Sequence, residues 1–378
     1  MAKKTVKNLG ISLGLLGTML ISTTTFAQEP ESGNRPAVVH ATPLTTARAT
    51  AQAAARDLAQ ADASSYTYTL ISFPGTLMTQ GVGMNPGALR LPGEKPGIEI
   101  VGAEFFPDGT SQTGFRAHIS KTRGVTDESY ELLNDPQSPS PQQPQQTYSV
   151  NDFGQTVGDY FDAEDVFYSY VVDCHDQRSC GQFKALDVPF SGATGTYSPA
   201  INNAGMIVGS WSDSAENQHS YTLIAGKFES FDVPAANKAE NQFLLLYYGI
   251  NSEGDIVGTF FDASFNTHGF LRKGNTYTTI DFPGAASTFA SGINDAGDIV
   301  GAYCPTIACL TSGLGELGFL LRNGAYTTVT IPTPPPQSGS PIPEPSVGLV
   351  AINNEGVLMG TYNDAAGLLY TFLATPTQ

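Results

Sequence analysis

The sequence has little basic charge: 18 Lys and Arg stand against 35 Asp and Glu, which gives a formal net charge of −17 over 378 residues. General nucleic-acid and anionic-membrane binders depend on clustered Lys and Arg, so this balance argues against both classes. Charged residues make up only 14% of the chain, whereas it contains 40 Gly, 25 Pro, 21 Phe and 16 Tyr. This composition argues against a helical bundle, and a hydrophobic content of 40% argues against a wholly disordered chain.

Long hydrophobic runs are absent after the N-terminal region, so we expect no transmembrane segment there. Residues 1–27 have the features of a secretory signal peptide: a basic start, a short apolar run over Ile11–Ile21, and a small-x-small cleavage site that ends at Ala27. An uncleaved anchor is the alternative. We therefore expect an exported, periplasmic or extracellular protein, in which residues 28–64 form a flexible Ala-rich tether and residues 65–378 form the folded domain.

Cysteine is scarce, and its four copies form two closely spaced pairs. Cys174 and Cys180 are separated by five residues, and Cys304 and Cys309 by four. Each pair can close a small loop under the oxidising conditions of an exported protein, which predicts two local disulfides. A zinc site built from all four thiolates is the alternative, although neither pair has the usual C-x-x-C spacing.

A repeat of about 50 residues runs through the chain from Tyr66 onward. Its clearest copy begins at Gly249 with Gly-Ile-Asn-Ser-Glu-Gly-Asp-Ile-Val-Gly and continues to His268-Gly269-Phe270-Leu271. Five copies share an Asn, a Gly three residues later and a second Gly seven residues after the Asn. These pairs of Asn and second Gly are Asn151/Gly158, Asn202/Gly209, Asn251/Gly258, Asn294/Gly301 and Asn353/Gly360. The earliest copy is expected to be degraded and to keep only Ile100-Val101-Gly102.

Each copy is predicted to form four short antiparallel strands, with the Asn-x-x-Gly step as a tight turn because Gly supplies a positive φ there. Repeated four-stranded units are typical of β-propeller blades, so we predict an all-β propeller with six blades. The strand Tyr66–Phe73 precedes the first complete unit, and the last unit stops after Leu369–Ala374 without a fourth strand. We therefore expect the N-terminal strand to complete the last blade and close the ring. An open β-solenoid or a split sandwich is the alternative.

The repeat resembles a known family. Ile-Asn-x-x-Gly-x-Ile-Val-Gly followed by His-Gly-Phe-Leu is similar to the HAF-type bacterial extracellular repeat, named for its His-Ala-Phe step. That step stands here as His268-Gly269-Phe270 and His219-Ser220-Tyr221, whereas a later copy has Leu317 in place of the His. The resemblance covers roughly residues 66–374. It implies an exported repeat protein, and it carries no established activity or catalytic residue.

The blade interpretation assigns the loops to two faces. The Asn-x-x-Gly turns share one face and are uniform. The loops between the second and third strands share the other face with the between-blade connections, which vary greatly and include the Pro-rich tracts Asn134–Thr147 and Pro332–Ser346. Variable loops on a rigid scaffold usually carry recognition. Tyr197, Phe243 and Phe289, which we expect in the between-blade connections, are therefore our candidates for a ligand surface.

An Asp follows the second Gly by four residues in several copies, namely Asp162, Asp213, Asp262 and Asp364. A ring of carboxylates could bind Ca²⁺ or a polyhydroxylated ligand, but Asp also favours the first position of a turn, and we favour the turn. Asp162, Glu164 and Asp165 form the densest acidic group and are the candidate metal ligands.

Other residues with chemical potential also recur at fixed places. His219 and His268 occupy equivalent positions, which favours a packing role, and H-E-x-x-H, G-x-S-x-G and Walker-type motifs are absent. Aromatic residues two places after the second Gly are predicted to pack between blades, although a carbohydrate platform would use the same residue types. They are Tyr160, Trp211, Phe260, Tyr303 and Tyr362.

The sequence therefore predicts an exported, monomeric propeller that acts as a binding module and is not an enzyme. A glycan or an envelope protein is the expected partner, and no cofactor is expected apart from a Ca²⁺ ion. The alternative is a polysaccharide lyase or glycoside hydrolase whose carboxylates, with a His or Tyr, meet at the mouth of the channel.

Overall fold

The computed structural model describes most of residues 66–377. Residues 1–65 and 378 lie outside the described part, as do the internal segments 72, 74–75, 77, 88–96, 107–111, 121–128, 134–144, 162–166, 175–179, 216, 235–247, 313–314, 332–345 and 364–368. The predicted signal peptide and the predicted tether therefore fall outside the described residues.

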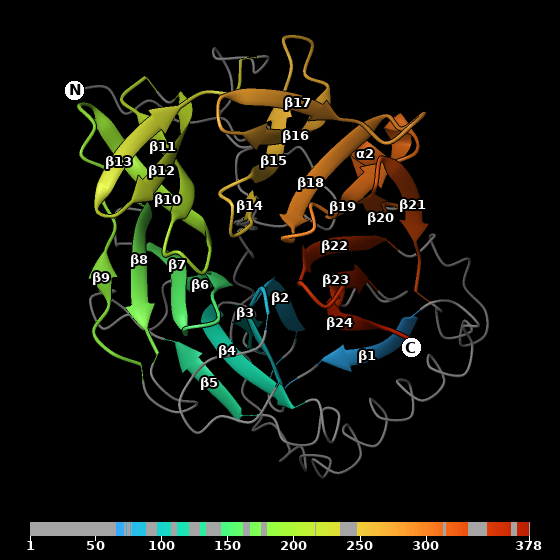
Figure 1. Cartoon of the computed structure of the whole chain (residues 1–378), viewed down its shortest axis with the longest axis horizontal. Helices are drawn as coiled ribbons and strands as arrows, with labels where there is room; N and C mark the ends of the chain where they lie inside the picture. The colour runs from blue at the N-terminus through green and yellow to red at the C-terminus, as the bar shows by residue number, and fades with distance from the viewer. Residues whose placement is uncertain are drawn as a thin grey trace, which may run out of the picture.

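The described residues form six antiparallel sheets of four strands each, arranged as a ring of blades (Figure 1). Blade 1 contains β2 (Met78–Met84), β3 (Gly97–Phe105), β4 (Gln112–Ser120) and β5 (Ser129–Leu133). Blade 2 contains β6 (Gln145–Val150), β7 (Gln155–Phe161), β8 (Phe167–Asp173) and β9 (Lys184–Ala185). Blade 3 contains β10 (Ala193–Ile201), β11 (Ile207–Asp213), β12 (Gln218–Ile224) and β13 (Lys227–Phe231).

The second half of the ring repeats this order. Blade 4 contains β14 (Tyr248–Ile250), β15 (Ile256–Phe261), β16 (Thr267–Lys273) and β17 (Thr276–Ile280). Blade 5 contains β18 (Ser287–Ile293), β19 (Ile299–Cys304), β20 (Leu317–Arg322) and β21 (Ala325–Val329), with the short helix α2 (Ile307–Ser312) between β19 and β20. Blade 6 contains β22 (Val347–Ile352), β23 (Leu358–Asn363) and β24 (Leu369–Pro376), and its fourth strand is β1 (Tyr66–Ile71).

The two ends of the domain therefore meet in one sheet. β1 pairs antiparallel with β24 from Tyr66 opposite Pro376 to Ile71 opposite Thr371, and Figure 1 shows the blue strand beside the red one. This pairing confirms the six-bladed propeller closed by the N-terminal strand. Because the sheets form a closed ring, the open solenoid and the split sandwich are wrong.

Burial decreases from the axis of the ring to its rim. The inner strand β18 is buried along its whole length, and the next strand, β19, is buried as well. The outer strand β21 has exposed and half-buried positions up to its buried last residue. Strands that pack between neighbouring sheets on both faces need apolar side chains on both faces, which explains the continuous Ile-Val-Gly runs in the sequence.

The Asn-x-x-Gly steps form the tight turns between the first and second strands. In blade 4 the Asn251 Oδ1 accepts the backbone N–H groups of Glu253 at 3.1 Å and Asp255 at 2.9 Å. Gly254 has a φ of 81°, and the four equivalent glycines have φ values between 73° and 79°. A side chain at this position would be strained, so the glycine is a requirement of the turn.

Blade 1 keeps the asparagine, which corrects the expectation that only Ile100-Val101-Gly102 survives there. The Asn85 backbone N–H donates to the Glu99 carbonyl at 3.0 Å, and the Asn85 Oδ1 accepts the Glu99 N–H at 2.8 Å. These are the bonds that Asn251 makes with Asp255. A longer connection, residues 86–96, separates the Asn from its second strand and hides it from a search for fixed spacing.

The same asparagines connect neighbouring blades. Each Nδ2 in blades 2 to 5 donates to the backbone carbonyl of the Asn in the following blade. The distances are 3.0 Å for Asn151 to Asn202, 2.9 Å for Asn202 to Asn251, 3.3 Å for Asn251 to Asn294 and 3.2 Å for Asn294 to Asn353. The Asn85 Nδ2 instead donates to Asp152 Oδ1 at 3.0 Å. The buried Nδ2 of Asn353 has no hydrogen-bond acceptor among the described residues, so this series is interrupted between blades 6 and 1.

Removing β1 tests the closure of the ring. Deleting residues 1–72 removes the strand and exposes the edge of β24, whereas deleting residues 1–64 leaves the closure intact. We expect the longer deletion to lower the melting temperature of the whole domain by more than about 10 °C, because Tyr68 and Ile71 are buried. Thermal unfolding followed by circular dichroism measures this. Equal melting temperatures for the two deletions would contradict closure by β1.

Candidate functional site

The predicted ligand residues do not meet in a pocket of the described residues. Tyr197 and Phe289 lie in the inner strands β10 and β18 and not in the between-blade connections where we expected them. Phe289 is only 5% exposed and packs with Ala302 and Val350 in the core, so its ring is not available to a ligand. Burial raises the pKa of Tyr197 to about 12. Phe243 lies outside the described residues.

The predicted metal ligands Asp162, Glu164 and Asp165 also lie outside the described residues. Within the described part of the chain, no group of three or more His, Cys, Asp or Glu side chains is placed to hold a metal ion. The Ca²⁺ site therefore stays a prediction.

The cysteines form two disulfides, Cys174–Cys180 and Cys304–Cys309, as predicted. The four-thiolate zinc site is wrong, because the sulfur atoms are bonded in pairs. The second disulfide closes the loop after β19 that carries α2, on the face where recognition is expected. No helix among the described residues is long and apolar enough to cross a membrane.

Among the described residues, a small cavity lies at the centre of the ring. Its volume is about 60 Å³, far below the roughly 300 Å³ of an ordinary ligand pocket. Small residues two places before each Asn let the inner strands approach one another here. They are Gly83, Ser149, Ala200, Gly249, Gly292 and Ala351. A Cβ atom added to Gly249 would lie 2.8 Å from the Gly292 Cα, so the inner strands of blades 4 and 5 approach each other too closely for a side chain here.

The aromatic residues two places after the second Gly form the contacts between blades, as predicted. All five are less than 9% exposed. In blade 5 the ring of Tyr303 stacks on Phe282, which belongs to the connection from blade 4, with ring centroids 3.7 Å apart. These rings are therefore core residues and do not form a carbohydrate platform.

The two repeat-equivalent histidines form matching polar clusters on the loop-rich face. In blade 4 the His268 Nδ1 lies 2.7 Å from Asp281 Oδ1 and its Nε2 lies 3.5 Å from Asp262 Oδ2, while the ring stacks on Phe260. His219 in blade 3 makes the same contacts with Asp232 at 2.9 Å and Asp213 at 3.5 Å, and it stacks on Trp211. Each His thus links the second–third hairpin to the end of the fourth strand.

Asp213 and Asp262 act as turn residues, which confirms the turn interpretation for these two positions. The Asp262 Oδ1 accepts the N–H groups of Ser264 at 2.8 Å and Asn266 at 2.9 Å, and its Oδ2 accepts the Asn266 side-chain amide at 2.9 Å. The Asn266 amide, followed by the backbone N–H groups, lowers the pKa of Asp262 to about 2. Asp162 and Asp364 lie outside the described residues.

Phe265 is the unusual residue of this turn. It has a φ of 63° and is 52% exposed. Among the described non-glycine residues, only Ala225 and Asn323 share a positive φ, and both are small. Such a turn usually places Gly or Asn at this position, and in blade 6 the sequence has Gly367 at the same distance from Asp364. A bulky side chain held in a strained conformation and in solvent has no evident role in the fold, so Phe265 is a candidate functional residue.

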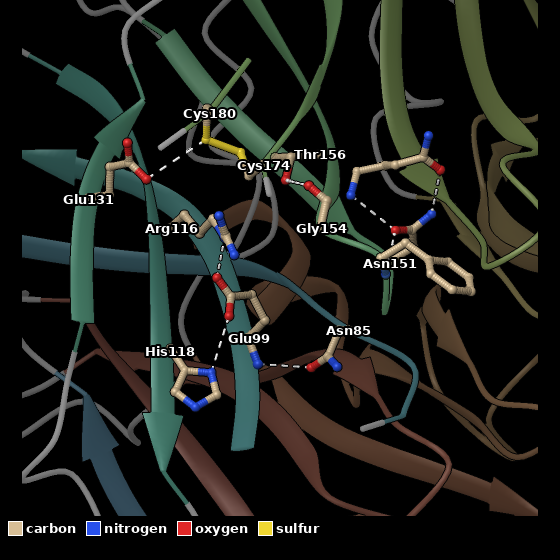
Figure 2. A network of polar contacts seen from close by, with 12 residues as sticks. Asn85, Glu99, Arg116, His118, Glu131, Asn151, Gly154, Thr156, Cys174 and Cys180 are labelled. Atoms are coloured by element: carbon tan, nitrogen blue, oxygen red, sulfur yellow. Dashed lines mark hydrogen bonds and ion pairs between the residues drawn. A yellow bond between two sulfur atoms is a disulfide. The ribbon is translucent and has the colours of Figure 1, made fainter. Parts of the chain in front are cut away.

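Blade 1 carries a buried cluster of an arginine, a glutamate and a histidine. Arg116, which is almost fully buried, donates from its Nε to Glu99, and the other Glu99 oxygen lies 3.3 Å from His118 Nδ1 (Figure 2). The residues equivalent to Arg116 in the other five blades are uncharged, namely Val171, Thr222, Leu271, Leu320 and Leu373. The cluster is closed to solvent, so it serves the packing between blades 1 and 2 and cannot contact a ligand directly.

Glu104 is the second exception in blade 1, and sequence reasoning missed it. It lies two residues after Gly102, where each of the other five blades has a buried aromatic residue. The carboxyl group is fully buried, and burial raises its pKa to about 8. The signal was present in the sequence, because a Glu interrupts an otherwise aromatic position of the repeat.

No protein-family model matches the chain, and no curated protein sequence matches it. Solved structures with a similar fold include the sialidase of Trypanosoma rangeli, at 8% identity and a TM-score of 0.45, over 78% of this chain and 54% of that chain. A mutant of AofleA from Arthrobotrys oligospora, in which arginines are replaced by alanine, has 10% identity and a TM-score of 0.46, over 82% and 87% of the two chains. A mutant of the Aleuria aurantia lectin, in complex with alpha-methyl-L-fucoside, has 10% identity and a TM-score of 0.42, over 80% and 98%. This chain spans about half the length of the trypanosomal sialidase, and the likeness is one of fold.

The Asn266 amide gives a test of the turn chemistry. Replacing Asn266 with Ala removes the largest influence that lowers the Asp262 pKa, so we expect this pKa to rise from about 2 toward its ordinary value of 3.8. A carboxyl with a lowered pKa stabilises the fold above its ordinary pKa and loses that contribution as the pH falls through about 4 to 2. The variant should therefore lose this acid-dependent part of its stability.

Carbon-detected NMR titration of the side-chain carboxyls measures both sites at once. Asp213 in the same variant is the control, and its pKa should stay at about 2. An Asp262 pKa that stays near 2 in the Asn266→Ala variant would show that the amide is not its cause.

Proposed function

We propose that this protein is an exported β-propeller of the HAF repeat type that binds a glycan on its loop-rich face without cleaving it. The hairpins and connections of this face differ from blade to blade, and such loops on a rigid scaffold usually carry recognition. On the opposite face, five of the six blades present short Asn turns whose polar groups bond to one another. The loop-rich face is therefore the better candidate for ligand binding.

The exposed ring of Phe265 is the observation that carries this proposal. A sugar presents an apolar face of C–H groups and a rim of hydroxyl groups, so its sites combine an aromatic ring with hydrogen-bond acceptors. Phe265 offers such a ring three residues before His268. The partner of His268, Asp281, keeps its side chain 53% exposed and presents carboxylate oxygen to solvent.

Blade 3 supports the proposal by comparison. It has the same polar cluster of His219, Asp213 and Asp232, but the sequence places Glu216 where blade 4 has Phe265. The fold therefore does not require an aromatic residue at this position. The strain at Phe265 is best explained by a role in which the ring contacts something outside the domain.

Two features support export. Both disulfides close short local loops, which is typical of proteins that fold in oxidising compartments. The N-terminal 27 residues have the order of a signal peptide. An exported propeller would meet the glycans of the cell envelope, so we expect one of these as its partner. The predicted tether over residues 28–64 would allow the propeller to move relative to its point of attachment.

The proposal is tested by measuring the binding of the chain without its first 27 residues to an array of soluble and envelope glycans. The Phe265→Ala variant should weaken the affinity at least about tenfold, which corresponds to about 1.4 kcal/mol. Phe153→Ala is the matched control, because Phe153 is 45% exposed on the opposite face, and it should bind as the parent does. Equal loss in both variants, or no binding to any glycan of the array, would contradict the proposal.

Phe265→Gly separates binding from folding. Glycine adopts a φ of 63° without strain, so this variant should keep or raise the melting temperature while it loses glycan binding. Release of reducing ends from a bound glycan would favour the alternative, a glycoside hydrolase or lyase, over a binding module.

A further inference from the structure

The contact between blade 6 and blade 1, which we call the closure seam, differs from the other five contacts. It packs β2 of blade 1 against β22, β23 and β24 of blade 6, and Ile71 of β1 lies in one apolar cluster with Ile100 of β3. The asparagine series stops here, because the Asn353 Nδ2 has no acceptor among the described residues. The aromatic residue that fills the other contacts is replaced by Glu104.

The substitution changes how the connection from blade 6 packs. Phe282, which precedes a proline in the connection to blade 5, stacks on Tyr303. Phe73 holds the equivalent place before Pro74, but it stacks on Tyr130 of β5 with ring centroids 4.4 Å apart. Glu104 therefore forms no stacked aromatic pair with Phe73, whereas Tyr303 and Phe282 form such a pair between blades 4 and 5.

A chain of hydrogen bonds crosses the seam and ends at Glu104. The Gly81 N–H donates to Thr371 Oγ1 of β24 at 2.7 Å, and the Thr371 hydroxyl donates to the Thr79 carbonyl at 2.8 Å. The Thr79 hydroxyl then donates to Glu104 Oε2 at 3.1 Å. Thr79, Glu104 and Thr371 are all less than 4% exposed, so this series of hydrogen bonds is shielded from solvent.

The second oxygen of Glu104, Oε1, is buried and has no hydrogen-bond partner among the described residues. A buried carboxylate without a cationic partner is costly, and burial accordingly raises the pKa of Glu104, while the hydroxyls of Thr79 and Thr76 act in the opposite direction. The neutral acid is the form that fits this site.

The groups that face Glu104 offer little to stabilise a charge. From β5 the titratable neighbour is Tyr130, whose own pKa is raised by burial and by the charge of Glu104. Gly81 of β2 pairs with Gly102, two residues before Glu104. The blade 6 side chains that lie nearest to Gly81 are those of Thr371 and Met359, and both are neutral. Arg116 pairs with Val101, so it points to the opposite face of the blade, toward blade 2.

We propose that Glu104 is a proton-dependent switch of the closure seam: the neutral acid keeps the seam closed, and its ionisation draws water into the loop-rich end and loosens β1 from blade 1. A group with a raised pKa in the folded state stabilises the fold fully below its ordinary pKa, near 4.5, and this contribution is lost as the pH rises through about 8. The switch therefore acts on the alkaline side. The apolar cluster around Ile71 and Ile100 keeps the rest of the seam packed.

Hydrogen exchange followed by mass spectrometry between about pH 6 and pH 9.5 tests the switch, after correction for the intrinsic pH dependence of exchange. In the parent protein, residues 66–71 and 369–376 should exchange about tenfold faster at the upper pH than at the lower, while β15 and β16 of blade 4 keep their protection. Glu104→Gln, which cannot ionise, should remove this selective change.

Two further variants give the direction of the effect. Thr79→Val removes a hydroxyl that favours the ionised carboxyl, so the midpoint of the change should move to higher pH. Glu104→Tyr installs the aromatic side chain of the other blades and should abolish the response even if Glu104→Gln folds poorly. A pH response that persists in either Glu104 variant, or one that affects all blades of the parent equally, would overturn the proposal.

Discussion

The hydrogen bond from one asparagine side chain to the backbone of the next asparagine is the interaction on which the ring depends. In blades 2 to 5 the asparagine oxygen closes its own turn and the nitrogen reaches the following blade, as Asn202 does toward Asn251. One side chain therefore couples the local turn to the angle between sheets. A neighbouring set of bonds, such as that from the Asp295 N–H to Asn354, supports the same contact.

Function is best sought where a blade departs from this pattern. Phe265 keeps a bulky ring at a backbone conformation that favours glycine, and Glu104 keeps a carboxyl group where five blades bury an aromatic ring. Both choices cost stability, and neither is required by the fold, since other blades manage without them. The features that blades 3 and 4 share, including the contacts within the two His–Asp clusters, are explained by packing and turn geometry, and they do not distinguish one blade from the other.

The fold could be predicted from the sequence because its signals are local and repeated. The Asn–Gly spacing marks the turns, and the fourth strand missing from the last unit indicates the closure by β1. The first blade was harder, because the long connection after Asn85 breaks the spacing. Tyr197 and Phe289 were misplaced because nothing in the sequence marks where an inner strand begins, and both strands start earlier than the turn pattern suggests. Glu104 could have been found by aligning the copies at the second glycine.

The central claim concerns the asparagine nitrogen, and Asn→Asp exchanges test it most directly. Asn202 and Asn353 make the same two turn bonds through Oδ1, and each is followed by an Asn, but only the Asn202 nitrogen has an acceptor in the next blade among the described residues. Both variants introduce the same negative charge into the same type of turn. Urea unfolding then measures the difference between their free energies of unfolding. We predict that Asn202→Asp destabilises the domain by about 1 to 3 kcal/mol more than Asn353→Asp. Equal losses would contradict the account.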